Sequence, residues 1–153
     1  MSSDEITVRD FRRSLRALER EVERSLASQT VCCGITSAQC HLLLEIADRG
    51  SASIGELAES LELDPSTLSR TADSLVRASL VSRVDDPANR RRQILDLSPS
   101  GREKVDFIDT LCDKYYESIL AEAETAQRRE IISAVGYLAR TIRAKRLPGV
   151  SCN

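Results

Sequence analysis

The chain has 153 residues, with 22 basic and 24 acidic side chains, a formal net charge of −2, one His, five Cys and no Trp. This length bounds it to one domain, with or without appended helices, and a composition of 41% hydrophobic and 30% charged residues excludes a disordered or low-complexity chain. No run approaches the roughly 18 apolar residues of a membrane helix and the first residues lack a signal-peptide core, so we expect a cytoplasmic protein without a membrane partner.

The first predicted element is a helix over residues 4–29. Its apolar side chains follow spacings of four, three and four on an otherwise highly charged segment. Such a heptad seam favours packing against another helix. The seam consists of Phe11, Leu15, Leu18 and Val22, with Leu26 beyond it.

Three shorter helices are predicted next, each with a recognisable start. Thr36 and Gln39 form a capping box for a helix that ends at Gly50, and Ser53 with Glu56 repeats that signal. Asp64 caps the third helix, which has Pro65 at its first position. A buried stripe of Leu68, Ala72, Leu75 and Val76 is expected on it.

The apolar period then changes to that of strands. Residues 80–84 and 93–97 predict two short strands, and residues 85–92 between them predict a long basic tip. Two helices follow, one from Ser98-Pro99 and one from about Thr125 to Arg146. The last has a second seam, at Ile131, Val135, Leu138 and Ile142. Because the central module of one chain cannot cover both seams, we expect a homodimer.

The predicted fold is mainly α with a small β-hairpin. A single domain over residues 1–153 would hold a winged helix-turn-helix at 36–97, flanked by dimerisation helices at 4–29 and 99–146. In this arrangement the second helix of the module enters the major groove of DNA, and the hairpin reaches the flanking backbone or minor groove. The candidate DNA contacts on the helix are Ser66, Thr67, Ser69 and Arg70.

The acidic total charge would ordinarily argue against nucleic acid. Residues 1–64 hold 7 basic and 12 acidic side chains, whereas residues 65–97 hold 6 and 4. The segment that would read DNA is therefore basic, and the acidic remainder is expected to limit non-specific binding.

The chain resembles the MarR family of winged-helix transcription regulators over nearly its whole length, most sharply from Ile35 to Gly101. Residues 86–91, Asp-Pro-Ala-Asn-Arg-Arg, and residues 97–101, Leu-Ser-Pro-Ser-Gly, are close to the family's wing pattern of Asp-Pro-x-Asp-Arg-Arg followed by Leu-Thr-x-x-Gly. Asn89 and Ser98 depart from it conservatively. Further segments that carry the resemblance are residues 34–39, 54–59, 66–70 and 80–83.

The resemblance implies a repressor, released from a pseudo-palindromic operator in double-stranded DNA when an effector changes the spacing of the recognition helices. Arg91 matches the wing arginine that enters the minor groove, and Arg90 would be a more variable neighbouring contact. Asp73 matches the helix carboxylate that orients Arg91 through a salt bridge. The effector pocket would lie between the dimerisation helices and the DNA-reading module.

The cysteines suggest how the effector is sensed. Their number is odd and the chain carries no secretion signal, so reduced thiols are expected. Cys32, Cys33 and Cys40 lie within nine residues and are followed by His41, on the border of the implied pocket, and Cys112 could face the same region. We expect Cys32 and Cys33 in a loop before the helix that holds Cys40.

Two thiol chemistries remain open. Cys32, Cys33, Cys40 and His41 are suitable ligands for a thiophilic metal or metalloid, although their spacing matches no standard zinc site. Alternatively, an oxidant converts a thiolate to a sulfenic acid that a neighbouring thiol resolves. The competing interpretation is that the cysteines are inert core residues and that the effector is a small organic ligand.

Two other function classes are disfavoured by the sequence. An enzyme is not expected, because the chain has no glycine-rich phosphate loop, no Gly-x-Ser-x-Gly motif and a single His without a catalytic partner. A winged helix that acts only through protein contacts is the second alternative. The three consecutive cations at residues 90–92 and the hydroxyl-rich helix start favour DNA over it.

Overall fold

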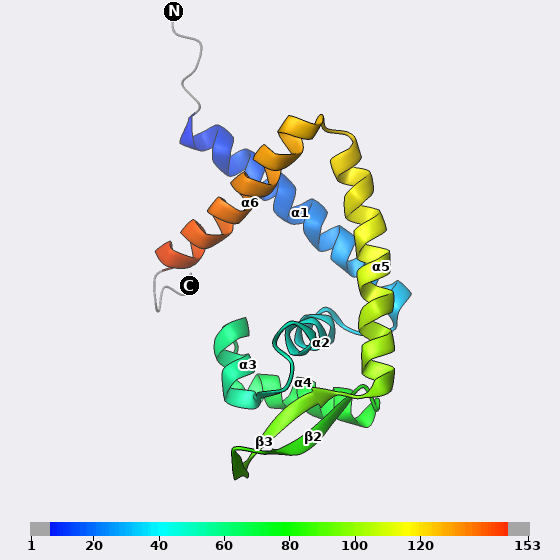
Figure 1. Ribbon diagram of the computed structural model, residues 1–153. Helices are drawn as coiled ribbons and strands as arrows, with labels where there is room; N and C mark the ends of the chain where they lie inside the picture. Colours follow the sequence, from blue (N-terminus) through cyan, green and yellow to red (C-terminus); the bar gives the residue numbers. More distant parts are fainter. Residues whose placement is uncertain (1–6, 147–153) are drawn as a thin grey trace, which may run out of the picture. The chain divides into compact units, whose positions relative to one another are not determined.

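The computed structural model describes residues 7–146, without the side chains of residues 29–32. The chain divides into two compact units, and their boundary falls inside helix α5 after Ile108. The second unit holds the remainder of α5 and helix α6 (Thr125–Lys145). The first unit contains α1 (Val8–Cys33), α2 (Ser37–Arg49), β1 (Ala52–Ser53), α3 (Ile54–Leu61), α4 (Pro65–Arg77), β2 (Val81–Asp86), β3 (Asn89–Leu97) and the start of α5 (Pro99–Ala121) (Figure 1).

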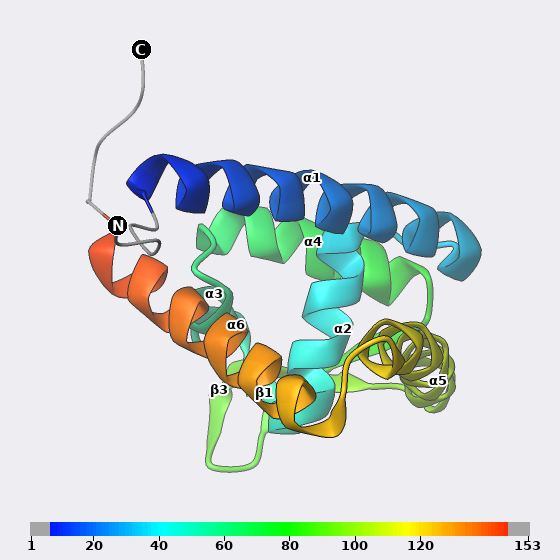
Figure 2. The same cartoon turned by 90° about the horizontal axis from the view of Figure 1, so that it is seen from above.

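The core of the first unit is formed where α2, α3 and α4 pack together beside the sheet (Figures 1 and 2). Leucine and isoleucine fill it, which is consistent with the stripes expected from the sequence. On α4, Leu68, Ala72 and Leu75 are buried as expected, whereas Val76 is only half-buried. The largest fully buried side chains are Leu42, Leu43, Ile46, Leu57, Leu68, Leu75, Leu95 and Ile108.

The capping signals in the sequence are all used. The Thr36 hydroxyl accepts the Gln39 N–H at 3.2 Å, and Gln39 Oε1 accepts the Thr36 N–H at 2.8 Å, which closes the box at the start of α2. Ser53 and Glu56 form the same reciprocal pair at α3. Asp64 caps α4, with Pro65 at the first position. These predictions of helix starts are confirmed.

The hairpin is longer than predicted and its tip is shorter. Strands β2 and β3 pair antiparallel as far as Asp86 and Asn89, so only residues 87 and 88 turn the chain. The Ala88 N–H donates to Asp86 Oδ1 at 2.9 Å, and the Arg91 N–H donates to Asn89 Oδ1 at 3.2 Å. Side chains thus hold this turn, and residues 90–92 belong to β3 rather than to a long loop.

A third strand, β1, completes the sheet in the order β1-β3-β2. Its two residues pair with β3, Ala52 with Leu95 and Ser53 with Ile94. The sequence analysis did not predict it, because two residues are too few to display a period of two.

Helix α1 also extends beyond the predicted end. It continues through Cys32 and Cys33 and stops at Gly34, whose φ of +67° lies in the left-handed region that glycine adopts freely. The expectation of a loop at Cys32 and Cys33 is therefore wrong. The N–H groups of the preceding turns continue the helical ladder until this glycine interrupts it.

Most side chains of the two apolar seams are exposed, although Leu15, Leu26 and Leu138 are half-buried. Phe11, Leu18 and Val22 on α1 are exposed, and α6 has no buried residue at all. On α5, Val105 and Ile108 are buried, but Tyr115, Tyr116 and Ile119 further along are exposed. Among the described residues, no helix is long and apolar enough to cross a membrane.

Candidate nucleic-acid interface

Helix α4, the predicted recognition helix, begins at an N-cap residue whose side chain accepts several hydrogen bonds. Asp64 Oδ2 accepts the N–H groups of Ser66 at 3.0 Å and of Thr67 at 3.3 Å, and it also accepts the Ser66 hydroxyl. The Ser66 hydroxyl and these backbone donors lower the pKa of Asp64. The helix start is thereby fixed before any ligand binds, with Ser66 and Thr67 exposed on it.

One turn further along α4, Arg70 is exposed and Ser69 is half-buried. Arg70 Nη2 lies 3.4 Å from Thr67 Oγ1, a long contact that leaves most of the guanidinium's donors available. The turn before the helix is made by Glu62, a non-glycine residue with a φ of 53° that caps α3. The structure therefore brings the four predicted helix residues together at one end of α4.

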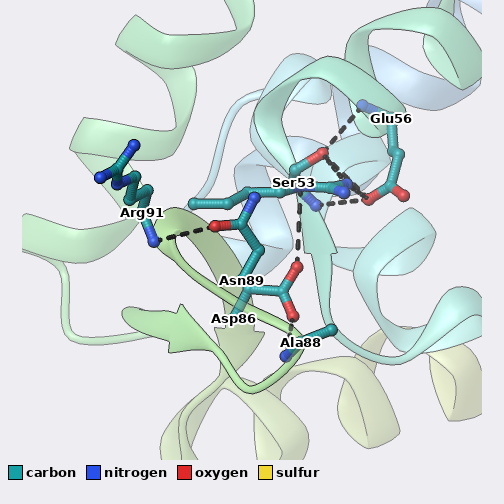
Figure 3. A network of polar contacts seen from close by, with 7 residues as sticks. Ser53, Glu56, Asp86, Ala88, Asn89 and Arg91 are labelled. Carbon is teal, nitrogen blue, oxygen red and sulfur yellow. Dashed lines mark hydrogen bonds and ion pairs between the residues drawn. The ribbon is translucent and has the colours of Figure 1, made fainter.

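The wing presents Arg90 and Arg91 to solvent. Within residues 7–146, neither side chain takes part in a hydrogen bond or ion pair, although the backbone N–H of Arg91 is held by Asn89 (Figure 3). Both guanidinium groups are consequently available to an anionic partner. Their assignment as DNA contacts remains a prediction.

The partner predicted for Asp73 is not the one the structure gives it. Asp73 Oδ1 on α4 accepts a hydrogen bond from Arg83 Nη2 on β2, rather than from Arg91. Because β2 follows α4 directly and packs against it, Arg83 reaches this carboxylate first. Asp73 thus ties the recognition helix to the base of the wing instead of orienting Arg91.

Arg92 is a further candidate residue of the wing, which the sequence presented only as one of three consecutive cations. Its Nη2 lies 2.7 Å from both Glu56 Oε2 and Ser53 Oγ at the start of α3. The signal that identifies it is the alternation of side chains along β3, which places Arg92 on the other face from Arg91. That signal becomes readable only once the strand is known to include these residues.

The thiols occupy different environments. Cys33 is 7% exposed at the end of α1, and its carbonyl accepts Lys104 Nζ of α5 at 3.0 Å. Cys40 is half-buried in the first turn of α2, where His41 is exposed. Cys112 is half-buried on α5 in the second unit.

No group of three metal-binding side chains occurs in the part of the chain that the structure describes. Since the side chain of Cys32 lies outside that part, the metal site proposed for Cys32, Cys33, Cys40 and His41 stays a prediction.

A direct link joins the start of α2 to the recognition helix. Gln39, which caps α2 with its oxygen, uses its Nε2 to donate to Ser74 Oγ on α4 at 2.9 Å. Ser74 in turn donates to the Thr71 carbonyl at 2.6 Å. A displacement of the first turn of α2, where Cys40 lies, would therefore move or break a hydrogen bond to α4.

Comparisons with known proteins agree with this geometry. A model of the MarR family matches residues 35–92. The HTH-type transcriptional repressor MdtR of Bacillus subtilis (strain 168) is 28% identical over 146 residues, which cover 92% of this chain and 93% of that protein. The uncharacterized HTH-type transcriptional regulator YsmB of the same strain is 32% identical over 111 residues, covering 71% and 74%.

Among solved structures, the fold is similar to that of the MarR family transcription regulator SP03579, with a TM-score of 0.79, 18% identity, and coverage of 90% of this chain and 91% of that one. The module formed here by α2, α3, α4 and the β2–β3 hairpin has the order of helices and hairpin expected for a winged helix-turn-helix. The chain belongs to the MarR family, whose members are regulators of transcription and not enzymes.

Proposed function

We propose that the chain is a homodimeric, sequence-specific DNA-binding repressor that occupies a pseudo-palindromic operator until an effector releases it. The observation that carries the proposal is a capped recognition helix and a wing with solvent-facing arginines in one compact unit. With the start of α4 in the major groove, Ser66, Thr67 and Arg70 would reach phosphates and base edges. Ser69, the fourth predicted contact on this helix, is half-buried and therefore less accessible than the other three. The repressor role is supported by the name of the Bacillus relative.

The wing supplies the second part of the interface. Arg91 would enter the minor groove, where a guanidinium reads width and negative potential, and Arg90 would contact the neighbouring backbone. Asn89 and Asp86 fix the backbone of the turn, and both arginines project from β3 directly after it. A guanidinium on a fixed turn loses less freedom on binding than one on a mobile loop.

Dimerisation is supported by the apolar side chains that the single chain leaves uncovered. On α1, Phe11, Leu18 and Val22 are 44%, 51% and 44% exposed, and on α6, Ile131 and Val135 are 44% and 53% exposed. Large apolar side chains that are exposed in a row along one helix are typical of an interaction site. A second copy is its proposed occupant, because the uncovered seams follow the heptad spacing at which helices pack on each other.

Selection from a random duplex library by the purified 153-residue chain tests DNA recognition and dimerisation together. We expect enrichment of an inverted repeat, with half-sites about ten base pairs apart or a multiple of that spacing, bound by two chains. Leu18→Glu should halve the solution mass and weaken binding to the selected duplex at least tenfold, since each half-site then binds alone.

The matched control for the dimer is Arg20→Glu, which adds more negative charge on the opposite face of α1 and should leave the mass unchanged. Enrichment of no sequence would refute DNA recognition and favour the protein-interaction alternative. A monomeric wild-type protein that binds the inverted repeat would refute the dimer.

We further propose that the effector acts on the thiols near the start of α2. Cys33 ends α1 beside the Lys104 contact to α5, and Cys40 follows Gln39, which bonds to α4 through Ser74. A chemical change at either thiol would thus strain helices that position the recognition helix. Peroxide would transfer one oxygen to a thiolate, giving a sulfenic acid that a second thiol converts to a disulfide with release of water.

Intact-mass measurement of trapped thiols, combined with operator affinity, tests the thiol proposal. Peroxide, Zn²⁺, Cu(I) or arsenite should change the mass of the wild-type protein and weaken DNA binding. Each thiol is tested by one variant: Cys33→Ala, Cys40→Ser or Cys112→Ser. A variant that lacks a required thiol should lose both the mass change and the change in DNA affinity. Cys32 and His41 are the candidate partners of that thiol. The fifth cysteine, Cys152, lies outside the described residues and far from the cluster in the sequence, so Cys152→Ser is the control. Unaltered mass and affinity would favour inert cysteines and a small organic effector.

A further inference from the structure

Arg92 makes the contacts that join the wing to α3. Its Nη2 lies 2.7 Å from Ser53 Oγ and 2.7 Å from Glu56 Oε2, and its Nε lies 3.8 Å from Asp86 Oδ2. Ser53 caps α3, Glu56 lies in its first turn, Asp86 ends β2, and Arg92 itself lies on β3. One guanidinium therefore connects the first turn of α3 with both strands of the wing.

The site that receives Arg92 on α3 is organised by the capping box. Glu56 Oε2 accepts the Ser53 N–H at 2.8 Å and the Ser53 hydroxyl at 2.9 Å, and Ser53 is only 8% exposed. These bonds from Ser53, together with Arg92, lower the pKa of Glu56 to about 2. The carboxylate is thus ionised and already in place, and a network of several charges is stronger than an isolated surface pair.

Strand geometry separates the roles of Arg91 and Arg92. Because successive side chains of a strand point to opposite faces, Arg91 turns away from α3 when Arg92 turns toward it. Figure 3 shows Arg91 directed away from Ser53 and Glu56. Asp86, which Arg92 approaches with its Nε, also accepts the Ala88 N–H and so holds the tip. The contact to α3 and the shape of the tip are consequently connected through Arg92.

We propose that Arg92 is a positioning residue for DNA binding, which holds the wing against the start of α3 and does not itself contact DNA. The inference rests on the proposed function, since the wing that Arg92 positions is the one that brings Arg91 to the groove. Without the contact to Glu56, the wing has to be ordered again each time DNA binds.

Glu56→Gln separates positioning from simple electrostatics, because the two explanations predict opposite signs. Glutamine still closes a capping box, but it lacks the charge that pairs with Arg92 and removes one negative charge from the DNA-binding unit. We expect Glu56→Gln and Arg92→Gln each to weaken binding to the selected duplex about tenfold, the cost of ordering roughly one backbone residue. The double variant should bind no more weakly than either single variant, because both remove the same contact.

The matched control is Glu59→Gln, which removes the same charge from an exposed position of the same helix. It should leave affinity unchanged or raise it. If Glu56→Gln behaves like this control while Arg92→Gln weakens binding, Arg92 contacts DNA and the inference is overturned. A wild-type protein that selects no duplex would instead overturn the proposed function along with it.

A second readout distinguishes positioning from a general loss of stability. The chain has no Trp, so Ala88→Trp places a single tryptophan at the wing tip, and excitation at the long-wavelength edge of tryptophan absorption avoids the tyrosines. We expect Arg92→Gln and Glu56→Gln to lower the fluorescence anisotropy of this tryptophan without DNA, while the thermal midpoint of unfolding is unchanged. Unchanged anisotropy in both variants, or a fall only together with the midpoint, would show that Arg92 does not position the wing.

Discussion

Gly101→Ala is expected to destabilise the protein by about 2–4 kcal/mol, more than most single substitutions, because the new methyl group overlaps backbone. A Cβ at this position would lie 1.9 Å from the Leu80 carbonyl oxygen and 3.0 Å from its carbon. That carbonyl accepts the Ser98 N–H at 3.0 Å, and the Ser98 hydroxyl accepts the Gly101 N–H at 2.9 Å. The first turn of α5 and the base of the wing are locked together here, so neither can withdraw from the other.

Urea denaturation at one fixed protein concentration measures the effect, since a dimer's stability depends on concentration. Gly55→Ala on α3 is the matched control, because the nearest atom to its Cβ is Ser53 Oγ at 4.0 Å. That substitution should stabilise the protein by about 0.5–1 kcal/mol, as Gly to Ala does inside a helix. If both substitutions have the same sign, the close approach of Leu80 to α5 is not what requires glycine at position 101.

Arg91→Ala is expected to weaken binding to the selected duplex at least tenfold, because each chain of the proposed dimer would lose a cation that neutralises phosphate charge. The slope of the logarithm of the binding constant against the logarithm of salt concentration should decrease by about one for each lost contact, or about two for a dimer. Titrations of the selected duplex at several salt concentrations measure both quantities.

The control for Arg91 is Arg49→Ala, which removes an arginine already paired with Glu45 at 2.6 Å on α2. It should change neither the affinity nor the slope. Undiminished binding by Arg91→Ala at physiological salt would mean that the wing arginine of this chain does not reach DNA.

Local signals in the sequence were sufficient for the helix starts. Thr36, Ser53 and Asp64 were each identified as a cap, because the side chain and the N–H groups that it bonds to lie within three residues of one another. The apolar stripe of α4 was also correct at Leu68 and Leu75. Such features depend on neighbours in the chain, and the sequence contains all the neighbours.

Features that depend on distant partners were not predicted. Asp73 was expected to pair with Arg91, but β2 brings Arg83 to it. The strand β1 was not predicted, because it has two residues and pairs with β3, about forty residues later in the chain. Cys33 was expected in a loop, yet the helix continues to Gly34 and the residue becomes buried.

The sequence by itself determined the basic character of residues 65–97 and the caps that begin each helix of the module, because these follow from composition and from contacts within one turn. Its motifs indicated the family by resemblance. The resemblance assigned DNA contacts to Arg90 and Arg91 and left Arg92 only as the third of three consecutive cations. Only the tertiary structure gave Arg92 a partner. The register of β3 leaves Arg90 and Arg91 in solvent and brings Arg92 to Glu56, a contact that exists because α3 and the wing fold against each other.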